Sequence, residues 1–118
     1  MKGMLIGTFL LLSAFSVFAQ RPKSGTYTYQ IAWAEQGGEL SGGTCTVVIK
    51  GDSIKILDNG SLTGEKGYVL VAGIIMRHKR TGKWIIGKNK NDVNAKDIGG
   101  CTDGPAVIDF KRKIWESC

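Results

Sequence analysis

Short segments in which apolar and polar residues alternate, separated by glycine-rich turns, follow one another from residue 26 to the end of the chain. In 26–33 (TYTYQIAW), one face carries the larger apolar residues Tyr27, Tyr29, Ile31 and Trp33. Alternation with a period of two is typical of a half-buried β-strand. On this basis we predict six strands, at 26–33, 44–50, 53–57, 68–79, 83–88 and 106–118.

Six short strands in one small domain predict an all-β fold. A small antiparallel up-and-down barrel of about six strands fits their close spacing, and a two-sheet β-sandwich is the alternative. In a barrel, the row of Tyr27, Tyr29 and Trp33 can line a small-ligand cavity, whereas in a sandwich it belongs to the core. A domain of this length has little interior to spare, which favours the core.

Turn residues set the expected connections between these strands. The pair Gly51-Asp52 predicts a tight hairpin turn between the second and third strands, and Thr81-Gly82 predicts a turn between the fourth and fifth. In the polar segment before the last strand, Asp92 is expected to cap a short helical turn over 93–98.

The first 19 residues follow the order of a secretory signal peptide. Lys2 precedes an apolar run of 15 residues, and small Ala19 ends the segment. The run is shorter than the ~20 residues that span a bilayer, so we expect cleavage before Gln20 and no membrane span. We therefore predict a signal peptide at 1–19, a flexible mature N-terminus at 20–25 and a single β-domain at 26–118, secreted or periplasmic.

The charge of the chain is mildly basic. It carries 16 Lys and Arg residues against 10 Asp and Glu residues, for a net charge of +6. The leader contains one lysine and no acidic residue, so the mature chain would carry +5. A basic excess of this size attracts anionic surfaces but is also common in domains that bind nothing charged.

Three cysteines allow one internal disulfide in an oxidising compartment and leave one thiol over. In an up-and-down order, the loops before the second and sixth strands lie at the same end, so we predict a Cys45–Cys101 bridge. Cys118 would then lie about 40 Å away along the last strand, giving a monomer or a Cys118-linked dimer. If the basic run 111–113 bends the chain sharply, a Cys101–Cys118 bridge is the alternative.

The stretch 76–84 (MRHKRTGKW) places the only histidine among four basic residues. His78 is the one candidate for a catalytic residue, a general base of a secreted hydrolase, with Arg77 or Arg80 holding an anionic substrate. There is no second histidine to serve as the acid, and no acidic motif lies beside it. A solvated hairpin end that resists aggregation is the plainer interpretation, so the sequence favours a protein that is not an enzyme.

Strand alternation divides this hairpin end between two faces. With a turn at 81–82, Lys79 faces Trp84 and Arg77 shares their face. The cations can then cover the indole in a cation–π contact worth ~0.5 to 1 kcal/mol. His78 falls on the opposite, apolar face, towards the core or the barrel lumen.

Neither a metal site nor a cofactor is predicted. The cysteines lack the C-x-x-C spacing of zinc sites, and the Asp and Asn residues of 89–103 do not match a calcium-binding loop. Asn59-Gly60-Ser61 matches the N-glycosylation sequon, although Asn-Gly is equally a turn signal.

These patterns favour an exported β-domain that acts by binding, with a small apolar ligand or another protein as its partner. The alternative is a secreted hydrolase or binder that acts on a polyanion such as nucleic acid, through His78 and its basic neighbours. The predicted ligand-binding residues are Tyr27, Tyr29, Trp33, Arg77, Lys79 and Trp84.

Overall fold

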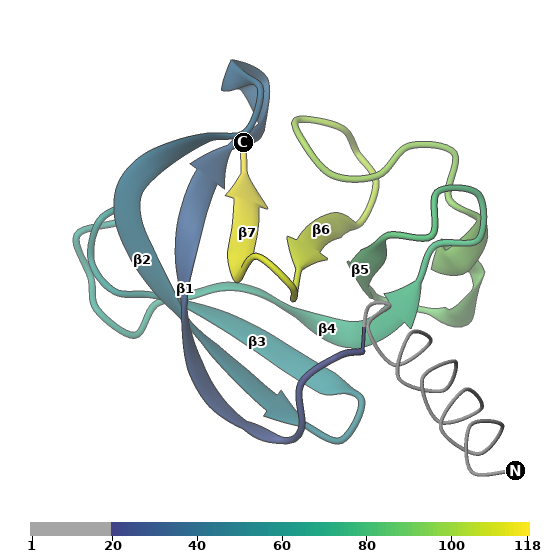
Figure 1. The fold of residues 1–118 in the computed structure, drawn as a ribbon, viewed down its shortest axis with the longest axis horizontal. Coiled ribbons are helices and arrows are strands. Elements are labelled where there is room, and N and C mark those ends of the chain that lie inside the picture. Colours follow the sequence, from purple (N-terminus) through teal and green to yellow (C-terminus); the bar gives the residue numbers. More distant parts are fainter. Residues whose placement is uncertain (1–19) are drawn as a thin grey trace, which may run out of the picture.

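Seven strands close into one barrel whose strand order follows the chain (Figure 1). The computed structural model describes residues 20–118, so the predicted signal peptide lies outside the described residues. Successive strands pair antiparallel, and β7 closes the barrel by pairing in parallel with β1. The predicted barrel is confirmed, with seven strands in place of six and one parallel pair. The elements are β1 Gly25–Trp33, η1 Ala34–Gln36 (a 3₁₀ turn), β2 Glu39–Lys50, β3 Ser53–Asp58, β4 Val69–Arg77, β5 Trp84–Gly87, η2 Lys90–Asn94 (also 3₁₀), β6 Ala106–Asp109 and β7 Ile114–Ser117.

The seventh strand arises because 106–118, predicted as one strand, folds into two. At the end of β6, the Asp109 carboxylate accepts a hydrogen bond from the Arg112 backbone N–H at 2.9 Å. Lys113 then adopts φ 58°, a left-handed conformation that helps to reverse the chain. The returning strand lies between β6 and β1, where the Lys113 carbonyl accepts from the Gln30 N–H at 2.9 Å. The single closing strand was therefore the wrong prediction.

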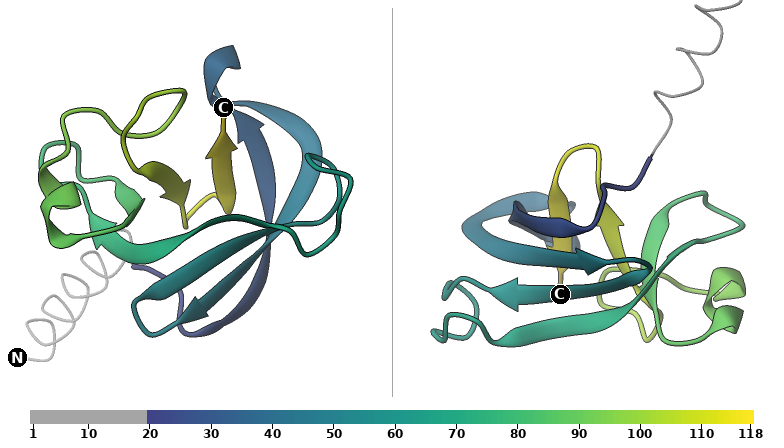
Figure 2. Two further views of the ribbon diagram at one scale, coloured as in Figure 1. Left: turned by 180° about the vertical axis from the view of Figure 1, so that it is seen from behind. Right: turned by 90° about the horizontal axis from the view of Figure 1, so that it is seen from below.

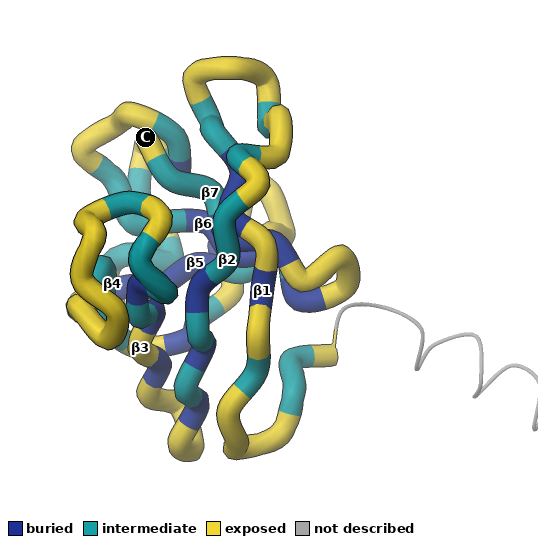
Figure 3. Tube along the Cα trace, turned by 90° about the vertical axis from the view of Figure 1, so that its left-hand side faces the viewer, coloured by how far each residue is buried: buried dark blue, intermediate teal, exposed yellow. Residues whose placement is uncertain are grey.

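Apolar side chains from all seven strands fill the barrel interior. Buried and more exposed positions follow one another along the strands, as Figure 3 shows for β1, β2 and β3. Burying one large apolar side chain stabilises a fold by roughly 1.5 to 3 kcal/mol, so this set is the main source of stability. The buried core comprises Tyr29, Ile31, Cys45, Val47, Ile49, Ile54, Ile56, Ile75, Ile86, Ile108, Phe110 and Trp115.

The N-terminal segment 20–25, predicted to be flexible, is tied to the β2–β3 turn. Arg21 forms an ion pair with Asp52, and Ser24 Oγ accepts a hydrogen bond from the Gly51 N–H at 2.9 Å. Gly25 already belongs to β1 and pairs with Ile49. The turn itself is the predicted Gly51-Asp52 hairpin, because Lys50 and Ser53 pair across it.

A long connection, 88–105, lies on one side of the barrel between β5 and β6 (Figure 2). Asn89 caps η2 by accepting from the Asn91 N–H at 3.0 Å, and the Asp92 carboxylate reaches back to accept from the Asn89 N–H at 3.3 Å. This reciprocal capping starts the turn three residues before the predicted 93–98 and makes Asn89, not Asp92, its cap. Within residues 20–118, no helix is long and apolar enough to span a membrane.

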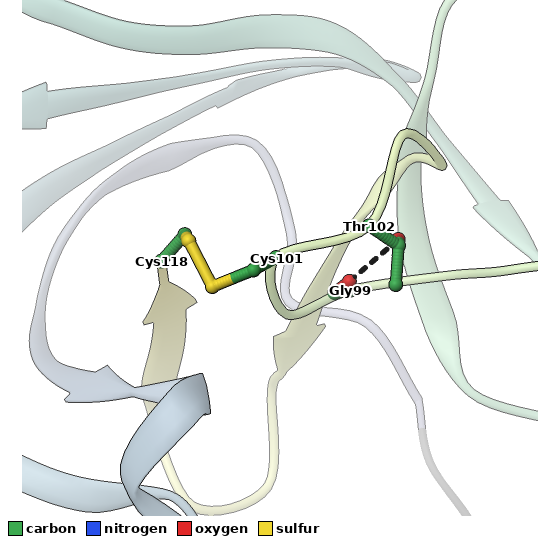
Figure 4. The surroundings of a disulfide bond; sticks show 4 residues. All are labelled: Gly99, Cys101, Thr102 and Cys118. Carbon is green, nitrogen blue, oxygen red and sulfur yellow. Dashed lines mark hydrogen bonds between the residues drawn. A yellow bond between two sulfur atoms is a disulfide. The ribbon is translucent and has the colours of Figure 1, made fainter.

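The disulfide joins Cys101 in this connection to Cys118 at the end of β7 (Figure 4). Nearby, the Thr102 hydroxyl donates to the Gly99 carbonyl at 2.7 Å. The predicted Cys45–Cys101 bridge is wrong, because the turn before β7 returns Cys118 to Cys101, which was the alternative. Cys45 stays unpaired and fully buried in the core, and burial raises the pKa of its thiol to about 11. The bridge also occupies the thiol that a Cys118-linked dimer would use.

Breaking the bridge by the double substitution Cys101→Ser and Cys118→Ser should lower the free energy of unfolding by about 3 kcal/mol, the chain-entropy value for a loop of this size. Urea denaturation measures the loss. A dithiol reductant should destabilise the unmodified protein by a similar amount and leave the double variant unchanged. A reductant effect of equal size in both would show that this bridge is not the stabilising one.

Asp58 organises the loop between β3 and β4. Its fully buried carboxylate accepts hydrogen bonds from the backbone N–H groups of Gly60, Leu62 and Thr63, and from the Thr63 hydroxyl at 2.6 Å. The Thr63 hydroxyl, followed by the backbone donors, lowers the pKa of this carboxyl to about 2 although burial opposes the change. The adjacent Asn59 side chain bridges two threonine hydroxyls of β2, at 2.8 and 2.9 Å, so the sequon asparagine is engaged in the fold.

This carboxylate makes stability depend on acid. Since the folded-state pKa lies below the ordinary value of 3.8, its contribution is present above about pH 4 and is lost as the pH falls towards 2. Asp58→Asn should therefore be less stable than the unmodified protein at neutral pH and should lose less stability between pH 4 and 2. Urea unfolding at several pH values measures both. Parallel pH profiles for the two proteins would contradict this role of Asp58.

Candidate ligand-binding groove

A groove of about 510 Å³ runs beside β6 and β7. The β4–β5 loop and the β6–β7 turn contribute residues to it, and so does the turn that follows η1. Three of the lining residues, Gly37, Gly38 and Gly82, have no side chain to cover the backbone at the groove. The lining residues are Ala32, Gly37, Gly38, Gly82, Lys83, Trp84, Val107, Ile108, Asp109, Phe110, Lys111, Arg112, Ile114 and Glu116.

The apolar part of the groove centres on Trp84 at the start of β5. Its partly buried indole packs edge-on against Phe110, with ring centroids 5.7 Å apart. The Arg77 guanidinium lies 4.8 Å from the centroid of the same indole, and Arg77 Nε donates to the Gly82 carbonyl at 3.0 Å. Because Arg77 does not line the groove, it holds the indole from outside while the ring contributes to the groove wall.

The hairpin that carries Trp84 has a different register from the predicted one. Arg77 pairs directly with Trp84, so the loop spans six residues, 78–83, in place of a two-residue turn. A shift by two residues keeps both side chains on the same face, and the predicted cation–π contact between Arg77 and Trp84 is confirmed. Lys79 lies in the loop instead of facing Trp84, and its N–H donates to the Val93 carbonyl at 2.9 Å.

Charged side chains border the apolar part of the groove. Lys83 on the β4–β5 loop and Lys111 and Arg112 on the β6–β7 turn are all exposed. Asp109 lies 3.9 Å from the Arg112 guanidinium and partly neutralises it. Glu116 is the second acidic lining residue. Cations from two separate sequence clusters therefore meet beside one pair of aromatic rings.

The aromatic residues predicted on β1 lie elsewhere. Tyr29 is 2% exposed and packs against Phe110 in the core, where burial raises the pKa of its hydroxyl to about 12. Tyr27 donates its hydroxyl hydrogen to the Lys23 carbonyl at 2.6 Å, and Trp33 ends β1 outside the buried core. None of the three lines the groove. Of the predicted binding residues, the groove contains Trp84, with Arg77 behind it.

His78 has a structural position. It is 0% exposed, and its two ring nitrogens contact the Ala95 carbonyl (Nε2, 2.7 Å) and the Thr81 hydroxyl (Nδ1, 2.9 Å). A carbonyl oxygen only accepts hydrogen bonds, so Nε2 carries a hydrogen. Nε2 fastens the β4–β5 loop to the long connection, and Nδ1 holds Thr81 within the same loop, so both ring nitrogens are engaged. The hydrolase alternative relied on His78 as its base, and this histidine is buried with both ring nitrogens engaged.

A second hollow lies between the β4–β5 loop and the long connection. It is shallow, measures about 570 Å³ and includes Lys79, Arg80 and Lys96 among its lining residues. The Arg80 guanidinium donates to the Lys96 carbonyl at 2.9 Å, which joins the loop to the long connection. The remaining lining residues are His78, Asn94, Ala95 and Asp97.

Among residues 20–118, one group of side chains has the spacing of metal ligands, namely Glu35, Cys101 and Cys118. Both cysteines are joined in the disulfide, so neither supplies a thiolate.

No protein-family model, curated protein or solved structure matches the chain.

Phe110, Lys83 and Arg112 were not predicted as binding residues. The signal for Arg112 was the basic run 111–113, which the strand assignment placed on alternate faces of a continuous strand. Phe110 directly follows β6 and lies beside Trp84, which pairs with Ile108 in the β5–β6 ladder. The position of Arg112 therefore depends on the reversal of the chain at 110–113, whereas the position of Lys83 depends on the longer β4–β5 loop.

Replacing His78 by Ala should lower the free energy of unfolding by about 2 to 4 kcal/mol, because it empties a buried position and leaves the Ala95 carbonyl without its partner. Thermal and urea unfolding measure this loss. Lys79→Ala, at the exposed neighbouring position, is the control and should change stability by about 0.5 kcal/mol or less. Equal stabilities of the two variants would contradict a structural role for His78.

Proposed function

We propose that this protein is an exported binding domain. Its ligand occupies the groove beside β6 and β7 that contains Trp84, named here the Trp84 groove. The observation that carries the proposal is the combination of two aromatic rings with exposed cations from two turns in one concave site. Binding pockets typically join apolar walls to a few placed polar groups, as this groove does. Export is supported by the signal-peptide pattern of residues 1–19.

The lining chemistry indicates the kind of ligand. Trp84, packed against the largely buried ring of Phe110, offers an apolar surface for a flat or aliphatic group, and Lys83 and Lys111 offer positive charge at its border. Arg112 is shared with Asp109, so an anionic ligand group would compete with that carboxylate. The best-matched ligand presents an apolar or aromatic group next to a negative charge.

A pair of fluorescent dyes tests both parts of this match. Anilinonaphthalene sulfonate has aromatic rings and one negative charge, and phenylnaphthylamine has the same rings without the charge. The folded protein should bind the anionic dye more tightly. Trp84→Ala should weaken its binding about tenfold or more, in line with the ~1 to 3 kcal/mol that a stacking contact contributes.

Matched variants separate the groove from the rest of the surface. Trp33→Ala removes another partly buried tryptophan that does not line the groove, and should leave dye binding unchanged. The double substitution Lys111→Gln and Arg112→Gln should weaken binding of the anionic dye and leave binding of the neutral dye unchanged. Cooperative unfolding of every variant confirms that dye is not binding to a loosened state. Equal losses for Trp84→Ala and Trp33→Ala would rule out the groove as the binding site.

A further inference from the structure

The positive charge of the protein is concentrated around the two turns that border the groove. Residues 20–118 contain fifteen Lys and Arg residues and ten Asp and Glu residues. Eight of those cations, but only Asp97 and Asp109 among the acids, lie in 77–83, 94–97 and 109–113. These eight exposed residues, named here the basic cluster, are Arg77, Lys79, Arg80, Lys83, Lys96, Lys111, Arg112 and Lys113.

Specific contacts bring the three segments of the basic cluster together. The pairing of Trp84 with Ile108 and its ring contact with Phe110 place the β4–β5 loop beside the β6–β7 turn. On its other side, the loop is fastened to 94–97 through His78 and Arg80. The β4–β5 loop thus lines two hollows that contain cations, the Trp84 groove through Gly82 and Lys83 and the shallow hollow through residues 78–80.

Cations in two hollows fit a ligand with repeated negative charges better than a ligand with one. The Trp84 groove supplies a partly exposed aromatic surface in the same path, which a phosphate or sulfate chain alone would not need. A basic groove combined with an aromatic stacking surface is the combination that binds single-stranded nucleic acid without sequence preference.

We propose that the partner of the groove is single-stranded nucleic acid. A base stacks in the Trp84 groove, and the flanking phosphates cross the β4–β5 loop to reach Lys79 and Lys96. This inference rests on the proposed function, because it uses the same groove, and it extends that function by naming the ligand class and adding the second hollow to the site.

Fluorescence anisotropy of a labelled oligothymidylate of about twelve nucleotides tests the proposal. Its affinity should fall about 50-fold between about 50 and 200 mM NaCl if roughly four phosphates are contacted. Trp84→Leu, which keeps an apolar side chain but removes the stacking ring, should weaken binding about fivefold or more.

Charge variants locate the second hollow. The double substitution Lys79→Gln and Lys96→Gln should lower the affinity for the oligonucleotide about tenfold and leave the affinity of the groove for the dye unchanged. Lys55→Gln with Lys66→Gln removes the same charge from exposed positions on β3 and the β3–β4 loop, and should cost less than about twofold. Equal losses from the two double variants would show a general charge effect and overturn the site.

Heparin, a sulfated chain without bases, distinguishes the other class of polyanion. If heparin binds as tightly as the oligonucleotide and Trp84→Leu changes neither affinity, the partner is not a nucleic acid. Dye binding in the groove without oligonucleotide binding would overturn this inference and leave the proposed function standing. If neither the dye nor the oligonucleotide binds, both this inference and the proposed function are overturned.

Discussion

The sharp reversal at 110–113 is the constraint on which the rest of the structure depends. Without it, β7 would extend beyond the barrel, and β1 would have no partner at the edge that now pairs with β7. The reversal has no glycine or proline to form it. It depends instead on the Asp109 carboxylate, which accepts from the Arg112 N–H, and on the left-handed backbone of Lys113. Once formed, it is held by the Gln30 N–H and by four residue pairs between β1 and β7.

Several features of the molecule follow from this one turn. It returns the chain terminus to the long connection, so that Cys118 meets Cys101 and Cys45 remains buried without a partner. It also places Lys111 and Arg112 in the groove that Lys83 and Trp84 line. The same structural step that closes the barrel therefore builds the groove. The long connection, fastened by the disulfide at one end and by His78 near the other, adds the second hollow beside it.

The alternation of apolar and polar residues and the turn residues predicted much of the fold but few of the residues that line the groove. Alternation in 26–33 identified β1 and its buried face, and Gly51-Asp52 located a hairpin, because each depends on residues adjacent in sequence. A bend at 111–113 was only the alternative prediction, because the alternation of Ala106, Ile108 and Phe110 continues up to it and no usual turn residue interrupts the segment. The six-residue β4–β5 loop was not predicted either. Backbone hydrogen bonds close it, from the His78 N–H to the Lys83 carbonyl and from the Gly82 N–H to the His78 carbonyl, and the His78 side chain binds a carbonyl 17 residues away in sequence. The contact between Arg77 and Trp84 was predicted because both side chains fall on the same strand face in the predicted register and in the observed one.

The most direct test of this account is a nuclear Overhauser spectrum of the folded protein, which reports proton pairs that lie close in space. A reversal at 110–113 predicts contacts between the backbone protons of Ile31 and Trp115, which are paired in the parallel β1–β7 ladder, and between the ring protons of Trp84 and Phe110. An uninterrupted extended strand over 106–118, with neither set of contacts, would contradict the closed barrel and remove the groove with it.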